Sequence, residues 1–246
     1  MTAQIIGPGR NNRTALGVAC GIGAGALWGL VFLAPELARD FNPLQLTVGR
    51  YLAYGLIAWA LLAARWKAVT TRIGRRDWLN LFWLALTGNT LYYILLSGAV
   101  QTGGIAMTSL VIGFLPVAVT IIGSRDHGAV PLKQLHLPLL LCIAGAVCIG
   151  WQALAAPVET SHMTRFIGFA CAVGALASWT FFAVQNARRL RQLEAVSAHD
   201  WNLLTGVVTG AQSLLLLPVA LLTASGAQHE AADWVRLAGV SVGVAV

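Results

Sequence analysis

Seven apolar runs, each about 20 residues long, dominate this sequence. They cover residues 15–34, 44–64, 78–100, 104–124, 137–156, 166–187 and 201–224. A helix needs about 20 mostly apolar residues to cross a bilayer, and a chain with 57% apolar and 10% charged residues has too few charges to cover a soluble surface. Because lipid offers the backbone no hydrogen-bond partner, each run should be a helix. The sequence therefore predicts an all-α, polytopic membrane bundle.

The acidic residues and the last run complete this pattern. All nine Asp and Glu residues lie between the runs or at their ends. A further apolar run begins at Trp234 and reaches the last residue, Val246. Its thirteen residues would rise about 20 Å as a helix, less than the roughly 30 Å hydrocarbon core. We therefore expect seven full spans and part of an eighth.

The basic residues indicate how the spans are oriented. Twelve of the sixteen Lys and Arg residues lie in alternate connecting segments: before the first span and after the second, fourth and sixth. Basic loops stay on the cytoplasmic side, so residues 1–14 should form a cytoplasmic tail of a multi-pass protein in a bacterial-type cytoplasmic membrane. The same asymmetry accounts for the net charge of +7, so no nucleic-acid partner is inferred.

One stretch of the sequence occurs twice. Residues 17–28 read GVACGIGAGALW and residues 168–179 read GFACAVGALASW, with identical residues at seven of twelve positions. The copies lie in the first and sixth runs, so they would cross the membrane in opposite directions, as in the inverted repeats of secondary transporters. Two Gly/Ala-rich helices can also look alike through packing alone, but the shared register of Cys and Trp favours a repeat.

Longer segments resemble a known family. The segment ALWGLVFLAPELARDFNPLQLTVGRYLAYGLIAWALLAARW is similar to the first helix pair of EamA-type transporters in the drug/metabolite transporter superfamily, through Trp28-Gly29, a Pro-containing outer loop and Arg50. The segment LYYILLSGAVQTGGIAMTSLVIGFLPVAVTIIG resembles helices three and four of that family. The chain departs from the family pattern after helix four, where Ser124-Arg125-Asp126-His127 replaces a Glu-Arg pair, so no role is transferred to these residues.

The resemblance implies a fold and a function. The family has ten helices in two halves of five, so residues 15–156 should form the first repeat and residues 165–246 an incomplete second repeat. It further implies a secondary transporter for small-molecule metabolites or drugs, often working in efflux. Two alternatives remain: a truncated membrane fragment that does not transport, and a permease-like subunit of a larger complex. The expected partners are the lipid bilayer, the small-molecule substrate and, in a possible homodimer, a second copy of this chain.

Polar stripes mark candidate cavity residues. Four-residue spacing places Asn89, Tyr93, Ser97 and Gln101 on one face of the third helix. The fourth helix carries a stripe that includes Pro116, where a kink is expected, and the seventh carries one that includes Thr209 and Gln212. Polar groups that face lipid are costly, so these stripes should line a substrate path. The alternative is that they form hydrogen bonds between helices.

Two aromatic residues and one cation complete the candidate substrate site. Trp28 and Trp179 occupy matched positions of the repeat and could face each other across a cavity or simply fill the core. Arg50 lies seven residues after Pro43, well within a span. It could snorkel outward and pair with Glu36 or Asp40, or it could bind an anionic substrate group through its planar fork.

Enzymatic chemistry finds no support in the sequence. It contains no nucleophile motif, no Gly-rich phosphate loop and no His/Glu pair at helical spacing, and the four Cys residues lie inside predicted spans without metal-site spacing. We therefore expect a protein that is not an enzyme and needs neither a cofactor nor a metal.

Overall fold

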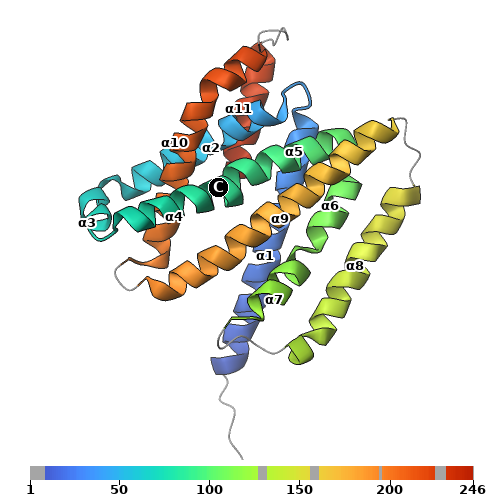
Figure 1. Ribbon diagram of the computed structural model, residues 1–246, viewed down its shortest axis with the longest axis horizontal. Coiled ribbons are helices and arrows are strands. Elements are labelled where there is room, and N and C mark those ends of the chain that lie inside the picture. The colour runs from blue at the N-terminus through green and yellow to red at the C-terminus, as the bar shows by residue number, and fades with distance from the viewer. Residues whose placement is uncertain (1–8, 127–131, 156–160, 194–195, 225–230, 246) are drawn as a thin grey trace, which may run out of the picture.

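The computed structural model describes residues 9–126, 132–155, 161–193, 196–224 and 231–245, and every regular element in these ranges is helical (Figure 1). The elements run in the order α1 (Gly9–Leu37), α2 (Pro43–Ala63), α3 (Trp66–Thr70), α4 (Arg75–Ala85), the π-helical turn η1 (Leu86–Thr90), α5 (Leu91–Gly103), α6 (Ile105–Gly113), α7 (Leu115–Gly123), the 3₁₀ turn η2 (Leu132–Gln134), α8 (His136–Ala155), α9 (His162–Gln192), α10 (Ala198–Ala224) and α11 (Ala231–Ala245). The expected all-α bundle is thus confirmed.

Six helices are long and apolar enough to cross a membrane. They span Ala15–Leu37, Pro43–Ala63, Arg75–Gly103, Ile105–Gly123, His162–Gln192 and Ala198–Thr223. Each matches one of the seven expected runs. The remaining run forms α8, which is not among the six, so the count of seven full spans stays a prediction. The expected tail overlaps α1, which begins at Gly9, and residues 1–8 lie outside the described residues.

The start of α2 is fixed by its own sequence. The Asn42 side chain accepts a hydrogen bond from the Gln45 backbone N–H at 2.9 Å, and Gln45 Oε1 accepts one from the Asn42 N–H at 2.8 Å. Pro43 takes the first helical position, where its missing N–H costs nothing. This capping box satisfies backbone donors at the helix end and sets the depth at which Arg50 enters the bundle.

Two helix pairs form the centre of the bundle (Figure 1). Helix α2 lies along α10, and α5 lies along α9, while α11 packs against α2 and α8 lies at the edge beside α6. The α2–α10 pair crosses at glycines: a Cβ on Gly55 would lie 2.5 Å from Gly210 Cα. Only residues without side chains allow two backbones to approach this closely.

A glycine turn separates the third expected span from the fourth, and the fourth is interrupted. Gly104, with φ of 83°, ends α5 and starts α6, a left-handed conformation that favours glycine. The fourth span breaks at Phe114 into α6 and α7, two residues before Pro116, whose ring nitrogen cannot donate the next helical hydrogen bond. Proline thus interrupts the fourth span as expected, whereas α10 continues through Pro218.

The buried side chains form two main clusters. One includes Phe41, Tyr51, Tyr93 and Leu96 and occupies the middle of the bundle among α1, α2, α5 and α9. The other joins α2, α3, α4 and α10 around Trp201, which is fully buried. The second cluster lies near the end of the bundle that carries the basic loops, and the first contains the candidate site.

Candidate functional site

Arg50 lies in the central cluster on α2. Its guanidinium carbon sits 4.5 Å from the centroid of the Tyr93 ring and 5.3 Å from that of Tyr51. Both distances fall within the range of a cation–π interaction. The Nε and Nη1 atoms are buried and have no hydrogen-bond partner among the described residues. The guanidinium is therefore held by ring faces and has hydrogen-bonding capacity left over.

The structure gives a different partner to one of the two carboxylates considered as a clasp for Arg50. Glu36 instead pairs with Arg39, three residues away on the same segment, at 2.7 Å. That pairing is local, whereas Arg50 is directed toward the tyrosines of α5.

Unpartnered hydroxyl groups accompany Arg50. The Tyr92 hydroxyl and Ser97 Oγ, both on α5, are buried and have no hydrogen-bond partner within 3.5 Å among the described residues, although Ser97 lies close enough to the Tyr93 hydroxyl to interact with it. Tyr92 and Tyr93 are close enough to Arg50 to interact with its charge. Buried polar groups normally find partners, so each exception calls for an explanation. Here one guanidinium and two hydroxyl groups share the same region of the bundle.

The two matched tryptophans contact each other. The Trp28 and Trp179 ring centroids are 5.7 Å apart, and Tyr92 lies 6.5 Å from Trp179. Phe32 packs against Trp28 at 6.5 Å. Since Tyr92 is the neighbour of Tyr93 in α5, this aromatic group continues from the Arg50 cluster to the α1–α9 contact. Trp28 keeps 37% of its surface exposed.

The polar stripes of the third and seventh spans face each other. Asn89 Nδ2 donates to Thr209 Oγ1 at 2.9 Å, and Thr90 Oγ1 donates to Gln212 Oε1 at 2.7 Å. Gln212 Nε2 in turn donates to the Phe82 carbonyl at 2.9 Å. These contacts join η1 and α4 to α10. Asn89, Thr209 and Gln212 therefore form the interhelical hydrogen bonds that were the alternative to a substrate path.

Gln101 and Pro116, the remaining sequence candidates, lie elsewhere. Gln101 Nε2 donates to the Phe41 carbonyl at 2.8 Å and so ties the end of α5 to the α1–α2 loop. Pro116 is exposed at the start of α7. The structure thus brings together Arg50, Tyr93 and Ser97 in the centre, with Trp28 and Trp179 beside them.

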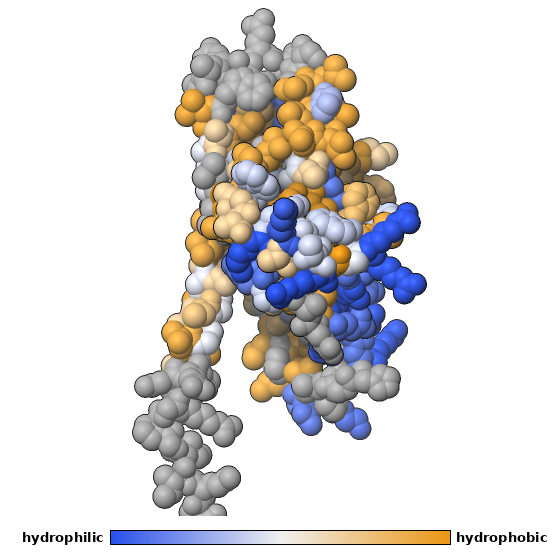
Figure 2. All heavy atoms as spheres, turned by 90° about the vertical axis from the view of Figure 1, so that its left-hand side faces the viewer, coloured by the Kyte–Doolittle hydropathy of each residue, from blue (hydrophilic) through white to orange (hydrophobic). Residues whose placement is uncertain are grey.

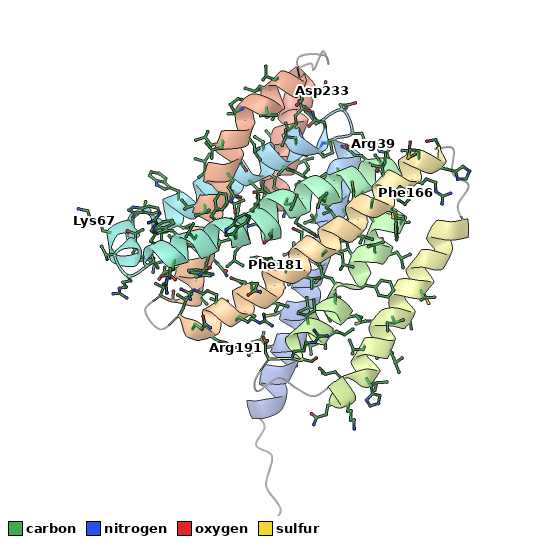
Figure 3. All side chains as sticks on the ribbon, in the orientation of Figure 1. Arg39, Lys67, Phe166, Phe181, Arg191 and Asp233 are labelled. Carbon is green, nitrogen blue, oxygen red and sulfur yellow. The ribbon has the colours of Figure 1, made fainter. Side chains whose placement is uncertain are left out.

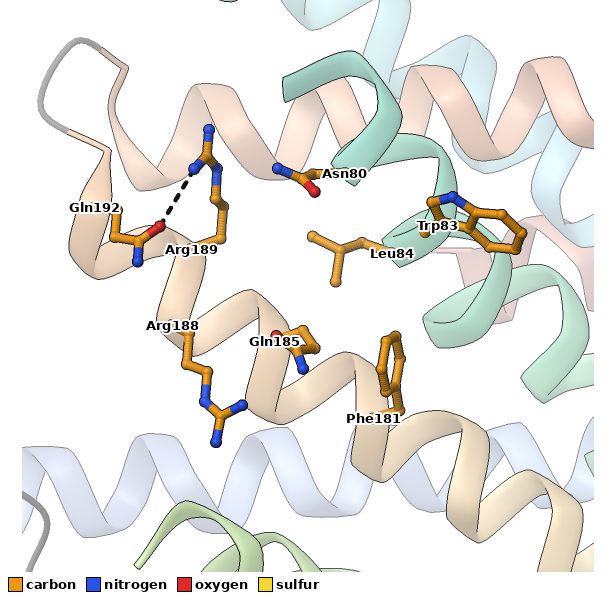
Figure 4. A pocket seen from close by; sticks show the side chains of 8 residues that line it. All are labelled: Asn80, Trp83, Leu84, Phe181, Gln185, Arg188, Arg189 and Gln192. Atoms are coloured by element: carbon orange, nitrogen blue, oxygen red, sulfur yellow. Dashed lines mark hydrogen bonds between the residues drawn. The ribbon is translucent and has the colours of Figure 1, made fainter. Parts of the chain in front are cut away.

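A cavity of about 330 Å³ opens between α4 and α9 (Figure 4). Asn80, Trp83 and Leu84 line it from α4, and Phe181, Gln185, Arg188, Arg189 and Gln192 line it from α9. Arg189 contacts Gln192 across its rim at 3.3 Å. A second cavity, of about 370 Å³, lies on the other side of α9 against α7 and shares Phe181, Gln185 and Arg188. Neither cavity includes Arg50.

Three ion pairs tie α9 and α10 to the first half of the chain. Arg188 binds Asp126 with three hydrogen bonds of 2.6 to 3.0 Å, Arg189 pairs with Asp77, and Arg65 pairs with Asp200 at 3.0 Å. Arg188 and Arg189 lie within one helical turn of Arg191, and Arg65 lies two residues before Lys67; Figure 3 shows Lys67 and Arg191 away from Arg39 and Asp233. Sequence reasoning missed these pairs, although each basic partner lies in a segment already identified as basic.

The basic residues gather on the same end. Figure 2 looks onto the side of the bundle that carries α3 and the start of α4, and shows hydrophilic side chains gathered there beneath an apolar region. The exposed basic residues of this segment are Arg65, Lys67, Arg72, Arg75 and Arg76. Within the described residues, no group of three or more His, Cys, Asp or Glu side chains could hold a metal ion.

Comparison with known proteins finds a matching family and a solved structure of similar fold. The model of the EamA-like transporter family matches residues 15–151. Inner membrane protein YtfF of Escherichia coli (strain K12) is 31% identical over 214 residues, which are 84% of this chain, and the chain spans 63% of the length of that relative. A solved crystal structure matches with a TM-score of 0.63, covering 94% of this chain and 77% of that chain at 20% identity, which shows the fold alone.

Proposed function

The chain belongs to the EamA-like transporter family, and from this premise we propose that it works as a secondary carrier that exports small metabolites or drugs. It is a multi-pass protein of the cytoplasmic membrane, as its inner-membrane relative and its apolar helices indicate. In the proposed mechanism, the two repeats rock against each other and expose a central site first to one side of the membrane and then to the other.

The contact between Trp28 and Trp179 is the observation that carries this proposal. The two residues are 151 positions apart, at the same place in the repeated stretch, and their rings meet at 5.7 Å. Residues related by an inverted repeat can meet only near the pseudo-two-fold axis that relates the halves. Substrate sites of such carriers lie at that repeat interface near the middle of the membrane.

The crossing of α2 and α10 is a second indication of the pseudo-two-fold axis that relates the two halves. Gly55 and Gly206 are also 151 positions apart. Both lie at the crossing: a Cβ on Gly55 would be 3.4 Å from the Gly206 carbonyl oxygen, and a Cβ on Gly206 would be 2.6 Å from Ala58 Cβ. An offset that recurs in a second helix pair favours a repeat over a chance likeness of two Gly-rich helices.

The ion pairs suggest which side is closed. In this arrangement α9 and α10 are tied to the first half by Asp77–Arg189, Asp126–Arg188 and Arg65–Asp200, all at the basic end. Basic loops favour the cytoplasm, so we propose that the N-terminus is cytoplasmic and that these pairs close the cytoplasmic entrance. Opening that entrance would require the pairs to separate.

Access to Ser97 from both sides tests the carrier mechanism without knowledge of the substrate. Ser97 is fully buried on α5 beside the Arg50 cluster. In a variant whose four cysteines are replaced, we expect Ser97→Cys to react with a membrane-impermeant thiol reagent both in intact cells and in inside-out vesicles. Ala99→Cys, equally buried but on another face of α5, is the matched control and should stay unlabelled. Reaction of position 97 from one side alone, or from neither, contradicts alternating access.

A further inference from the structure

The charge of Arg50 lacks an acidic counterpart inside the bundle. No ion pair of Arg50 occurs among the described residues, and all nine acidic residues of the sequence lie outside the apolar runs or at their ends. An ionisable group within a span normally pairs with another group or marks a substrate pathway. A bound anion would give this buried cation the partner that its Nε and Nη1 atoms lack among the described residues.

The neighbours of Arg50 are suited to a carboxylate. Its Nε and Nη1 atoms, which have no partner among the described residues, lie on different edges of the guanidinium, so each can donate to a carboxylate oxygen, Nη1 as one prong of the planar end-on fork. The unpartnered Tyr92 hydroxyl and Ser97 Oγ are further donors on the adjoining α5. Ser97 follows Tyr93 by one helical turn, so it shares the face on which the Tyr93 ring meets Arg50.

The same surroundings do not favour a cationic group on the ligand. The rings of Tyr51 and Tyr93, which could hold an ammonium ion, already hold the guanidinium. All nine acidic residues of the sequence lie outside the apolar runs or at their ends, away from the middle of α2 and α5 where an ammonium would need them. The aromatic contact of Trp28, Trp179 and Phe32, reached through Tyr92, offers an apolar surface next to the cation.

We propose that the Arg50 cluster binds an organic monoanion, with its carboxylate on the Arg50 fork and its apolar part against Trp28 and Trp179. This inference rests on the proposed carrier function, because neither described cavity beside α9 includes Arg50. A ligand reaches the cluster when α2 and α5 separate during the transport cycle. Zwitterions and neutral analogues of the same shape bind more weakly.

Titration of the detergent-solubilised protein with matched probes tests the charge requirement. The probes are benzoate, its neutral isostere benzamide, zwitterionic phenylalanine and phenyl phosphate, and the readouts are tryptophan fluorescence and thermal unfolding. We expect benzoate to bind and to raise the unfolding temperature, and the other three to bind more weakly. Equal binding of benzamide, or the absence of binding by benzoate, overturns the proposal. Tighter binding of phenyl phosphate overturns the assignment to a carboxylate.

Variants identify the residue that carries the charge. Arg50→Lys keeps the charge but lacks the planar fork, and we expect it to weaken benzoate binding by about tenfold to a hundredfold. Arg39→Lys is the control, since Arg39 is exposed and paired with Glu36, and should bind benzoate as the parent does. Ser97→Ala, which removes one small donor, should weaken binding by a smaller factor and serves as the second variant if Arg50→Lys does not fold.

The outcomes separate this inference from the proposed function. If Ser97→Cys is labelled from both sides but benzoate does not bind, the proposed carrier function is supported and the proposed monoanion site is contradicted. If benzoate binding depends on Arg50 but Ser97→Cys is labelled from one side only, the proposed anion site is supported and alternating access is contradicted. Unchanged benzoate affinity in Arg50→Lys overturns the site whatever the labelling shows.

Discussion

At the scale of single residues, burying Arg50 costs more free energy than its contacts return. Insertion scales assign about 2.5–3.5 kcal/mol to a charge at the centre of a bilayer and less toward its edge, whereas a cation–π contact returns about 0.5–2 kcal/mol. Two buried nitrogen atoms without partners add to the cost. A residue that costs stability without a structural return is typical of a functional site.

Replacement of Arg50 by methionine should expose this cost. We expect Arg50→Met to raise the free energy of unfolding of the ligand-free protein by about 1 kcal/mol, because an apolar chain of similar length no longer buries an unpaired charge. Thermal unfolding in detergent measures the change, and the same sample should lose its stabilisation by benzoate. A loss of stability beyond about 2 kcal/mol would instead identify Arg50 as a structural residue.

At the scale of helices, the α2–α10 crossing depends on its glycines. The ideal Cβ of Gly55 falls 2.5 Å from Gly210 Cα and 3.2 Å from Gly210 N. Both neighbours are backbone atoms, which cannot move aside as a flexible side chain can. A single methyl group at this position therefore has to push the two helices apart.

Gly55→Ala should consequently destabilise the bundle by about 1–3 kcal/mol through overpacking. Gly21→Ala on α1 is the matched control, since nothing lies within 4 Å of its Cβ position. There the substitution should be neutral or stabilise by up to about 1 kcal/mol, because alanine favours the helix. Unfolding by heat or by denaturing detergent compares the two variants. Equal effects would mean that α2 and α10 do not cross at Gly55.

The helices themselves could be predicted from the sequence, because lipid leaves an apolar run of 20 residues no other regular structure. The interruptions are harder to predict. Pro116 predicts the break between α6 and α7, but nothing in Leu86–Thr90 predicts the π-helical turn. The Phe82 carbonyl shortly before this turn accepts a hydrogen bond from Gln212, 130 residues away in the chain. Helical spacing identified the polar stripes, whereas their pairing is decided only when α10 packs against η1.

At the scale of the whole molecule, the two ends of the bundle differ in charge. Exposed Lys67 and Arg72 lie in the segment that also carries Arg65, the partner of Asp200, while the opposite end carries Arg39 with its local partner Glu36. The central cluster of aromatic residues lies between these two ends. Such a distribution fits a protein whose basic end remains in the cytoplasm.

Labelling of single cysteines should reveal this orientation. In the cysteine-free background, we expect Arg39→Cys to react with an impermeant thiol reagent in intact cells and Lys67→Cys to react only in inside-out vesicles. Both positions are exposed, so each serves as the control for the other. Reaction of Lys67→Cys in intact cells would reverse the proposed topology.

The π-helical turn η1 has a consequence for how the third span can move. It amounts to one surplus residue in a continuous helix, closed by the bond from the Leu91 N–H to the Leu86 carbonyl. Within a helix that stays formed at both ends, the extra residue can move along the chain by the exchange of one backbone hydrogen bond at a time. Each such step changes the orientation of the residue that it passes, by about 100° around the helix axis, while the helical segments on either side keep theirs. Tyr93 and Ser97 would turn in this way only if the extra residue moved past them along α5.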